Sequence, residues 1–463
     1  MPLHANDDDG RSAQQHRGLT RRRFQAALMA TPAALLGAPA GVLVAPAGLW
    51  GTRAALCAAS ATPLAAGAAE GPAVLLGIDG EFGLDNSTSA QAVELGVKVA
   101  VEQINQAGGV LRGRPLAIVT KDHRSIPARG IRNIEEFAAM PDVLAVFGGR
   151  FSPVVIEQLP LLKATRMPFL AVWSAADVIV DNGSSPNFAF RLSLRDGLAM
   201  PFMMQQARQR GIERVGLLLT NTSWGRSNQA AVEKYAVAQR VPQVIGTAWY
   251  NWQERTLIDK YHKLIDAGAQ AVLLVANDDE AAVLVREMAA LPRDKRVPVL
   301  SHWGVTGGRF AKEAGAALRE VDFSVIQTFS FFQARQPGLD RFMATARQFG
   351  VQRIEDIESP VGVAHAYDMT HILAKAINLA GRADRAAVRD ALEHVATHDG
   401  LIRRYAPPFT AQRHEALGPA ELLMARYRED GVIVPIAPAA TSAAAPADKR
   451  AGARPASASA PAR

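Results

Sequence analysis

The chain has 463 residues, of which 49% are hydrophobic and 21% are charged, and it contains a single cysteine, Cys57. This composition excludes a largely disordered chain, and the length favours two or three lobes over a single core. One cysteine excludes a disulfide framework and any thiolate-based zinc or iron–sulfur site.

The formal net charge of +7 is concentrated at the two ends of the chain. Residues 1–69 hold six arginines against three aspartates, and the segment 70–436 holds 41 basic against 40 acidic residues. A groove that follows nucleic-acid phosphates needs clustered basic residues without compensating acids, and the nearly neutral body has no such stripe. We therefore expect no nucleic-acid partner.

The N-terminal segment, residues 1–69, is predicted to be an export signal and linker. Thr20-Arg21-Arg22-Arg23-Phe24 precedes an apolar stretch from 26 to 50, a pattern that resembles a twin-arginine signal. Small-residue triplets at 59–61 and 66–68 offer cleavage sites. The alternative is a retained membrane anchor, because the apolar stretch is long enough to span a bilayer, although its prolines and glycines make a poor helix.

The body alternates short apolar runs with amphipathic segments. Buried strands are predicted at 74–78, 116–120, 143–147, 169–172, 215–220, 271–275, 298–301 and 324–328. Helices are predicted at 90–106, 129–139, 230–239, 257–267, 280–291 and 367–379. Strands without polar alternation, each followed by a helix, indicate an α/β fold with parallel sheets covered on both faces. The Ala-, Pro- and Ser-rich tail, 437–463, is predicted to be disordered.

Eight strands are compatible with one large sheet, a barrel or two doubly wound lobes. The late helix at 367–379 and a last apolar run at 432–436 favour two lobes between which the chain crosses back. The sequence contains no dinucleotide fingerprint, phosphate loop or nucleophile elbow, so we predict neither a cofactor nor an enzyme. The histidines 365, 371, 394 and 398 are interpreted as solvated helix residues rather than metal ligands.

Several landmarks occur in one order along residues 72–436. They include Gln91-Ala92, Ile104-Asn105 and Gly108-Gly109-Val110, then Phe147-Gly148-Gly149 with Ser152, Trp173-Ser174-Ala175, Ser223-Trp224-Gly225 and Ala366-Tyr367-Asp368. Together they resemble the periplasmic solute-binding proteins of the leucine/isoleucine/valine-binding family. The resemblance implies two doubly wound parallel-sheet lobes joined by three hinge crossings. It places lobe 1 at 72–191 plus 326–402 and lobe 2 at 192–325 plus 403–436.

The resemblance also suggests a ligand site on the loops that face the gap between the lobes. Ser152 matches the serine that binds the ligand carboxylate in the family, and its alternative role is that of a helix N-cap. Ser174 is expected to supply the hydroxyl where Ala175 replaces the family's threonine. Trp173 and Trp224 would add apolar walls.

Trp303 stands near the position of the acidic residue that pairs with an amino acid's ammonium in the family, which disfavours an amino-acid ligand. Asn277, with Asp278 and Asp279, is the substitute polar group, and helix capping is its alternative role.

We therefore predict a monomeric periplasmic protein that binds a small amino acid or carboxylate, aromatic acids included, by hinge closure. Its partners would be the permease and ATPase of an ABC-type importer. The first alternative is a sensor module that signals to a receptor or kinase. The second alternative is an enzyme on the same scaffold, but we identify no pair of nucleophile and base in the sequence that would support it.

Overall fold

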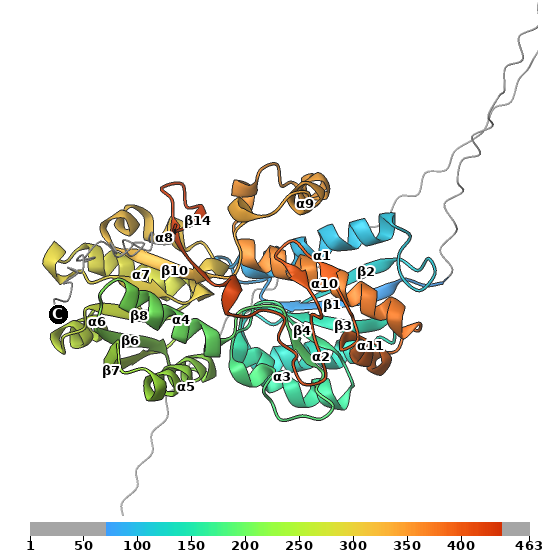
Figure 1. The fold of residues 1–463 in the computed structure, drawn as a ribbon, viewed down its shortest axis with the longest axis horizontal. Helices are drawn as coiled ribbons and strands as arrows, with labels where there is room; N and C mark the ends of the chain where they lie inside the picture. The colour runs from blue at the N-terminus through green and yellow to red at the C-terminus, as the bar shows by residue number, and fades with distance from the viewer. Residues whose placement is uncertain (1–70, 438–463) are drawn as a thin grey trace, which may run out of the picture. The chain divides into compact units, whose positions relative to one another are not determined.

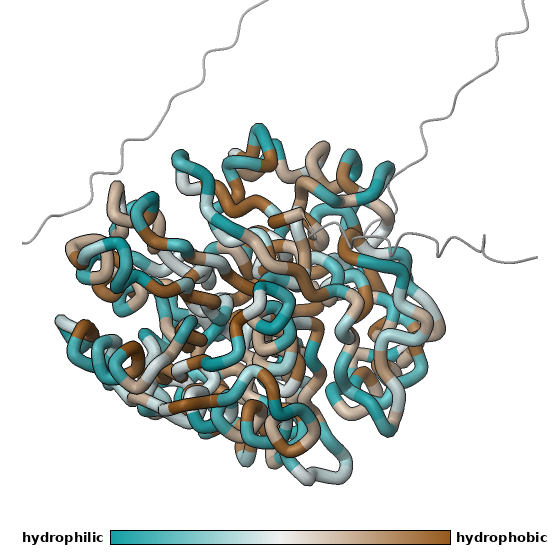
Figure 2. The backbone as a smooth tube through the Cα atoms, turned by 60° about the vertical axis from the view of Figure 1, so that its left-hand side comes forward, coloured by the Kyte–Doolittle hydropathy of each residue, from teal (hydrophilic) through white to brown (hydrophobic). Residues whose placement is uncertain are grey.

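The computed structural model describes residues 71–437, so the predicted export signal, Cys57 and nearly all of the predicted tail lie outside the described residues. Within this range the chain alternates strands and helices around two sheets (Figure 1). The predicted α/β class with parallel strands is confirmed. Hydrophobic segments recur along the backbone between hydrophilic ones, which is the alternation expected for buried strands and half-buried helices (Figure 2).

The first sheet has the order β2-β1-β3-β4-β5, and all of its strands are parallel. Its strands are β1 (Val74–Gly80), β2 (Leu116–Asp122), β3 (Val143–Gly148), β4 (Phe169–Ala171) and β5 (Ala189–Arg191). Around it lie α1 (Ser89–Gln106), α2 (Pro127–Ala138), α3 (Ser152–Ala164), α9 (Gly338–Ala346), α10 (Pro360–Ala380) and α11 (Arg385–Leu392). We call this sheet and these helices the first lobe.

The second sheet has the order β14-β13-β10-β9-β8-β6-β7. Its strands are β6 (Arg214–Thr220), β7 (Gln243–Tyr250), β8 (Ala271–Val275), β9 (Val299–Ser301), β10 (Phe323–Gln327), β13 (Leu423–Tyr427) and β14 (Ile433–Pro435). Its helices are α4 (Asp196–Gln209), α5 (Ser223–Ala238), α6 (Ile258–Asp266), α7 (Asp278–Ala289) and α8 (Phe310–Ala314). We call these elements the second lobe. The pairs β10–β13 and β13–β14 are antiparallel, and the other pairs of this sheet are parallel.

The chain passes between the two sheets three times, after β5, after β10 and before β13. A separate short ribbon, β11 (His398–Asp399) and β12 (Arg404–Tyr405), lies before the last crossing. The segment that follows β10 returns to the first lobe, where α10 packs along α1 and Tyr367 donates a hydrogen bond to Gln103 over 2.7 Å. The lobe boundaries given above stay a prediction.

The turn after α1 shows how local chemistry fixes one connection. Apolar residues recur on the buried face of α1 up to Ile104, and the helix then ends in Gly108 and Gly109, whose φ angles are +101° and +72°. Asn105 exchanges hydrogen bonds of 2.8 and 2.9 Å with the backbone of Leu116, the first residue of β2. Glycine suits these two positions because it adopts such angles without strain.

The interpretation of the histidines as solvated helix residues is wrong for His365 and His398, whereas His371 is half-buried in α10 and His394 is exposed in the turn after α11. His365 is completely buried in α10, and His398 lies in β11 rather than on a helix, where it stacks on His371 and Tyr405. Burial lowers the pKa of His365 to about 3 and that of His398 to about 3. The spacing of His394 and His398 is that of one helix face, but α11 ends at Leu392, before both residues.

Candidate ligand-binding site

Each sheet reverses its strand order at one point, and the loops at these points come from the carboxyl ends of neighbouring strands. In the first lobe the reversal lies between β1 and β3, which are followed by Glu81 and by Arg150 to Ser152. In the second lobe it lies between β6 and β8, which are followed by Trp224 and by Asn277 and Asp278. Open parallel sheets bind ligands at such points.

Arg150 joins the two lobes. Its Nη1 donates to Asp278 Oδ1 over 2.6 Å and to the backbone oxygen of Gly304 over 3.3 Å, and both acceptors belong to the second lobe. The side chains of Arg150 and Asp278 are 5% and 2% exposed. Burial by itself would lower the pKa of Arg150, but the carboxylates of Asp278 and Glu81 outweigh it and raise the pKa. The guanidinium is therefore a buried cation.

Glu81 is the acidic partner of Arg150 within the first lobe. It is completely buried, and its Oε1 lies 3.8 Å from Nε of Arg150 and accepts hydrogen bonds from Ser87 and Ser89. Its Oε2 lies 3.7 Å from Nε2 of His123 and has no hydrogen-bond partner among residues 71–437. Arg150 thus sits between two carboxylates, one from each lobe.

The segment before α1 strengthens this contact between the lobes through its backbone. The N–H of Thr88 donates to the oxygen of Gly307 over 2.9 Å, and the N–H of Arg309 donates to the oxygen of Asn86 over 3.1 Å. Asn86 also donates to Asp279 over 3.2 Å. A Cβ on Gly307 would lie 2.6 Å from Nη1 of Arg150, so glycine here leaves room for the guanidinium.

Two of the predicted tryptophans meet across the lobes. The rings of Trp173, after β4, and Trp303, after β9, have centroids 5.9 Å apart, and each residue is 1% exposed. Trp303 also lies 5.4 Å from the ring of His365. The indole nitrogen of Trp173 has no hydrogen-bond partner within the described part of the chain. A buried donor without a partner is costly, which marks this position as a place for an acceptor.

The three small residues predicted for the site, Ser152, Ser174 and Ala175, lie close together. The N–H groups of Ala175 and Ala176 each donate to Oγ of Ser152 over 3.2 Å, so the serine holds the loop that follows Trp173. Its hydroxyl proton remains available for donation. Ser174 is completely buried, and its Oγ has no partner among the described residues. Ser152 is the first residue of α3 rather than its N-cap, which is Phe151.

Trp224 and Asn277 approach each other around Gly304. A Cβ on that glycine would lie 2.5 Å from Cη2 of Trp224 and 3.2 Å from Oδ1 of Asn277. The indole of Trp224 donates to Asp196 over 3.2 Å. Asn277 occupies the N-cap position of α7, yet its side chain makes no capping hydrogen bond there. The predicted site residues therefore form two groups. The first contains Ser152, Trp173, Ser174 and Ala175 and contacts Trp303. The second contains Trp224 and Asn277, which lie around Gly304, the residue after Trp303.

Sequence reasoning missed Glu81, Arg150 and a second aromatic pair. Phe151 packs edge-on against Trp252 with ring centroids 5.3 Å apart, and the guanidinium of Arg150 lies 4.9 Å from the ring of Phe151. The signal that identifies Glu81 and Arg150 is their place directly after the strands flanking the reversal point. That signal requires the strand order, which the sequence does not give.

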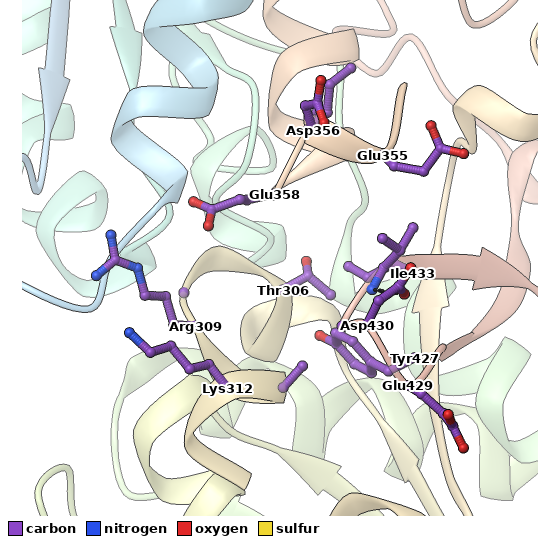
Figure 3. A pocket seen from close by; sticks show the side chains of 15 residues that line it. Thr306, Arg309, Lys312, Glu355, Asp356, Glu358, Tyr427, Glu429, Asp430 and Ile433 are labelled. Carbon is purple, nitrogen blue, oxygen red and sulfur yellow. Dashed lines mark hydrogen bonds between the residues drawn. The ribbon is translucent and has the colours of Figure 1, made fainter. Parts of the chain in front are cut away.

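A cavity of about 770 Å³ lies beside this contact but differs from it in chemistry (Figure 3). Arg309 and Lys312 from the second lobe line one side, and Glu355 and Glu358 from the segment before α10 line another. These charged side chains lie at the surface and Arg309, Lys312 and Glu358 are exposed to solvent. The cavity contains none of the residues predicted for the ligand.

The comparisons with known proteins agree with this architecture. The family model described as "Periplasmic binding protein" matches residues 73–431. The chain therefore belongs to the periplasmic binding protein family, whose members act outside the cytoplasm as solute-binding proteins. Within residues 71–437 no helix is long and apolar enough to cross a membrane. The comparison with curated proteins found no match.

Solved structures of this type are similar to the chain in fold. A type 1 periplasmic binding protein from Bordetella pertussis has a TM-score of 0.70 at 20% identity, covering 79% of this chain and 100% of its own. The branched-chain amino acid binding protein LivJ of Streptococcus pneumoniae, in complex with isoleucine, has a TM-score of 0.65 at 16% identity, covering 79% and 100%. A solute-binding protein of R. palustris in complex with benzoate has a TM-score of 0.63 at 14% identity, covering 79% and 95%.

Proposed function

We propose that this protein is an extracytoplasmic solute-binding protein that captures a small amino acid or carboxylate between its lobes and delivers it to an ABC-type importer. The observation that carries the proposal is the set of buried polar atoms without partners at the contact between the lobes. Within the described residues these are Glu81 Oε2, Arg150 Nε, Trp173 Nε1 and Ser174 Oγ. A folded protein leaves few such groups, so a bound ligand is their natural partner.

The proposed mechanism is closure of the hinge around the ligand. Ser152 and Trp173 belong to the first lobe, whereas Trp224, Asn277 and Trp303 follow strands of the second. A ligand that contacts both sets binds the closed form better than the open form, so it shifts the population toward closure. The permease and ATPase would then recognise the closed form. We assign the three hinge crossings to the boundaries near residues 191, 326 and 402.

The relatives support the ligand class. One solved structure of this fold holds isoleucine and another holds benzoate, and both ligands join a carboxylate to an apolar body. The paired tryptophans of the present site offer apolar walls for such a molecule, and buried donors without partners among the described residues, such as the indole N–H of Trp173, offer hydrogen bonds to its carboxylate. We propose that the ligand leaves unaltered, because Ser152 Oγ faces two backbone amides rather than a base that would activate it.

Export by the twin-arginine route is part of the proposal and rests on residues 20–24, outside the described part of the chain. Replacing Arg21 and Arg22 by lysine should retain the precursor in the cytoplasm, as immunoblots of cell fractions would show. Unchanged export of that variant would contradict the route without touching the binding function.

A thermal-shift screen tests the binding function. Amino acids, aromatic acids and dicarboxylates are added to the purified protein, since a ligand at 100 times its dissociation constant stabilises the folded state by about 2.7 kcal/mol. We expect a raised melting temperature for at least one class. Melting temperatures that do not change with any of the three classes would contradict the proposal.

A further inference from the structure

Arg191 is a completely buried arginine at the point where the chain first leaves the first lobe. It is the last residue of β5, and its Nε donates to the two carboxylate oxygens of Glu415 over 3.1 and 3.0 Å. Glu415 belongs to the segment before β13, which is the third crossing. The N–H of Arg191 donates to the oxygen of His414, and the N–H of Ala416 donates to the oxygen of Arg191. The first and third crossings therefore run side by side.

The other side of the guanidinium holds the loop that carries predicted ligand residues. Its Nη1 donates to the backbone oxygens of Ser174 and Ala176 over 3.3 and 3.1 Å, and its Nη2 donates to that of Asp177 over 3.3 Å. The planar guanidinium of arginine has five N–H donors, which is enough to contact a carboxylate and three carbonyls at the same time. Arg191 therefore fastens residues 174–177 to the two paired crossings.

Ser152 holds the same loop from the other direction. The N–H groups of Ala175 and Ala176 each donate to its Oγ over 3.2 Å. Because the carbonyl oxygens bond with Arg191 and the N–H groups bond with Ser152, the orientation of the peptide planes in this loop is fixed. That orientation also fixes where the loop presents Ser174, whose buried Oγ has no partner among the described residues.

The second lobe contacts this loop as well. Asp196, the first residue of α4, donates its backbone N–H to the oxygen of Ala175 over 2.9 Å. The N–H of Asp177 donates to Oγ of Ser227 in α5 over 3.1 Å. The carboxylate of Asp177 accepts a hydrogen bond from Nε of Arg195 over 3.0 Å. The loop thus bonds with both lobes and with the two crossings, so its conformation depends on how these parts are arranged.

We infer that Arg191 is a positioning residue for ligand binding, which fixes residues 174–177 in their binding orientation by fastening them to two of the three hinge crossings. The inference rests on the proposed function and adds to it a residue outside the predicted ligand contacts. Glu415 and the loop carbonyls occupy the guanidinium, so Arg191 does not contact the ligand and acts on affinity through the loop.

The variant Arg191→Lys tests the inference. Lysine keeps the positive charge beside Glu415, but its donors all lie on one nitrogen, which cannot reach the carboxylate and three carbonyls together. The probes are isoleucine, benzoate and the compound of the thermal-shift screen that binds the wild type most tightly. We expect calorimetry on the folded variant to show affinity at least about tenfold lower. In the ligand-free variant, NMR should show hydrogen exchange at the amides of Ala175 and Ala176 at least about tenfold faster.

Arg389→Lys is the matched control, because Arg389 is a buried arginine of the first lobe with the same kinds of partners. It pairs with the carboxylate of Glu393, and its Nε donates to the backbone oxygen of Asn187 over 2.8 Å. We expect this variant to lose stability in urea denaturation but to keep affinity within about twofold of the wild type. A residue that only stabilises the fold would behave like this control. Arg191→Lys with the affinity and amide exchange of the control would overturn the inference.

Glu415→Gln provides a second variant in case Arg191→Lys does not fold. It leaves the three bonds to the loop in place and weakens only the anchor on the third crossing. We therefore expect a smaller loss of affinity, about threefold, with faster exchange at the same two amides. Wild-type affinity and exchange in Glu415→Gln would also overturn the inference. Absence of binding by the wild type to every compound of the screen would instead count against the proposed function, and the amide exchange would still test the role of Arg191.

Discussion

The contact between the lobes and the cavity beside it are neighbours in the structure but opposite in character. The cavity has a volume of about 770 Å³ and is lined by solvent-exposed charges, such as those of Arg309 and Lys312. At the contact, Arg150 and Trp173 are nearly completely buried and carry donors without partners among the described residues. Exposed charges satisfy themselves with water, whereas buried donors require a partner. These buried donors are the reason why we propose the ligand site at the contact between the lobes rather than in the larger cavity.

The largest expected effect concerns the ion pair that joins the lobes. Asp278→Ala removes the partner of Arg150 in the second lobe, and removing one member of a buried pair costs about 3–5 kcal/mol. Because Arg150 regains water when the lobes separate, we expect the ligand-free protein to open, and small-angle scattering should show a larger radius of gyration. The triple variant Glu81→Gln, Arg150→Met and Asp278→Asn leaves no unpaired buried charge in this cluster and should restore closure. An unchanged radius in Asp278→Ala would show that this contact does not hold the lobes together.

The second effect is a dependence of the free energy of unfolding on pH, which arises from the buried His365 beside Trp303. Burial lowers the pKa of His365, which packs on Trp303, to about 3. The unfolded chain binds this proton below about pH 6.5, so the contribution is complete above that pH and is lost as the pH falls toward 3. We expect His365 to account for a loss of about 2–3 kcal/mol between pH 6.5 and 4.5.

The buried carboxyls of Asp79 and Asp368 oppose this change, because burial raises the pKa of each to about 6. The comparison is therefore made between the wild type and His365→Gln, by urea denaturation at both pH values. Equal losses in the two proteins would contradict the assignment to His365.

Ser152 provides the third effect. Ser152→Ala removes the acceptor of the Ala175 and Ala176 N–H groups, so we expect the free energy of unfolding to fall by about 1–3 kcal/mol. Ligand affinity should fall with it, because the loop that carries Trp173 and Ser174 loses its anchor. Ser152→Thr keeps the hydroxyl and serves as the control. A variant with wild-type stability and affinity would remove Ser152 from the site.

A smaller effect is expected from the tryptophan pair, Trp173 and Trp303. Trp303→Phe reduces the apolar surface opposite Trp173 and should weaken binding by about tenfold, while the fold is retained. Trp249→Phe is the matched control, because that indole stacks on Arg226 in the second lobe. Calorimetry with the tightest ligand of the screen distinguishes the two. Equal affinities of both variants would place the ligand away from Trp303.

The smallest effect is predicted for the cavity. Replacing Arg309 and Lys312 together by methionine should change ligand affinity less than about twofold, because exposed charges contribute little. A large loss of affinity in this double variant would move the binding site from the contact between the lobes to the cavity.

The sequence predicted the fold well because buried strands and amphipathic helices carry local periodic signals. The apolar runs at 74–78 and 271–275 lie within β1 and β8. The short β5 and the less buried β7 were missed, since neither has a continuous apolar run. Glycines 108 and 109 identified a helix end because their requirement for positive φ is local as well.

The site was predicted only in part, for a physical reason. Trp173 and Trp303 were identified through the family resemblance, and the structure brings their rings together. Arg150 was missed because its role depends on two partners, Glu81 and Asp278, that lie 69 and 128 residues away along the chain. Charge pairing across lobes depends on strand order and closure, neither of which has a local signal in the sequence.

A crystal structure of the protein with the tightest-binding ligand of the screen tests the account most directly. The account predicts that the ligand lies between the lobes, with its apolar body against Trp173 and Trp303. Density for the ligand in the cavity beside Arg309 and Lys312 would contradict it.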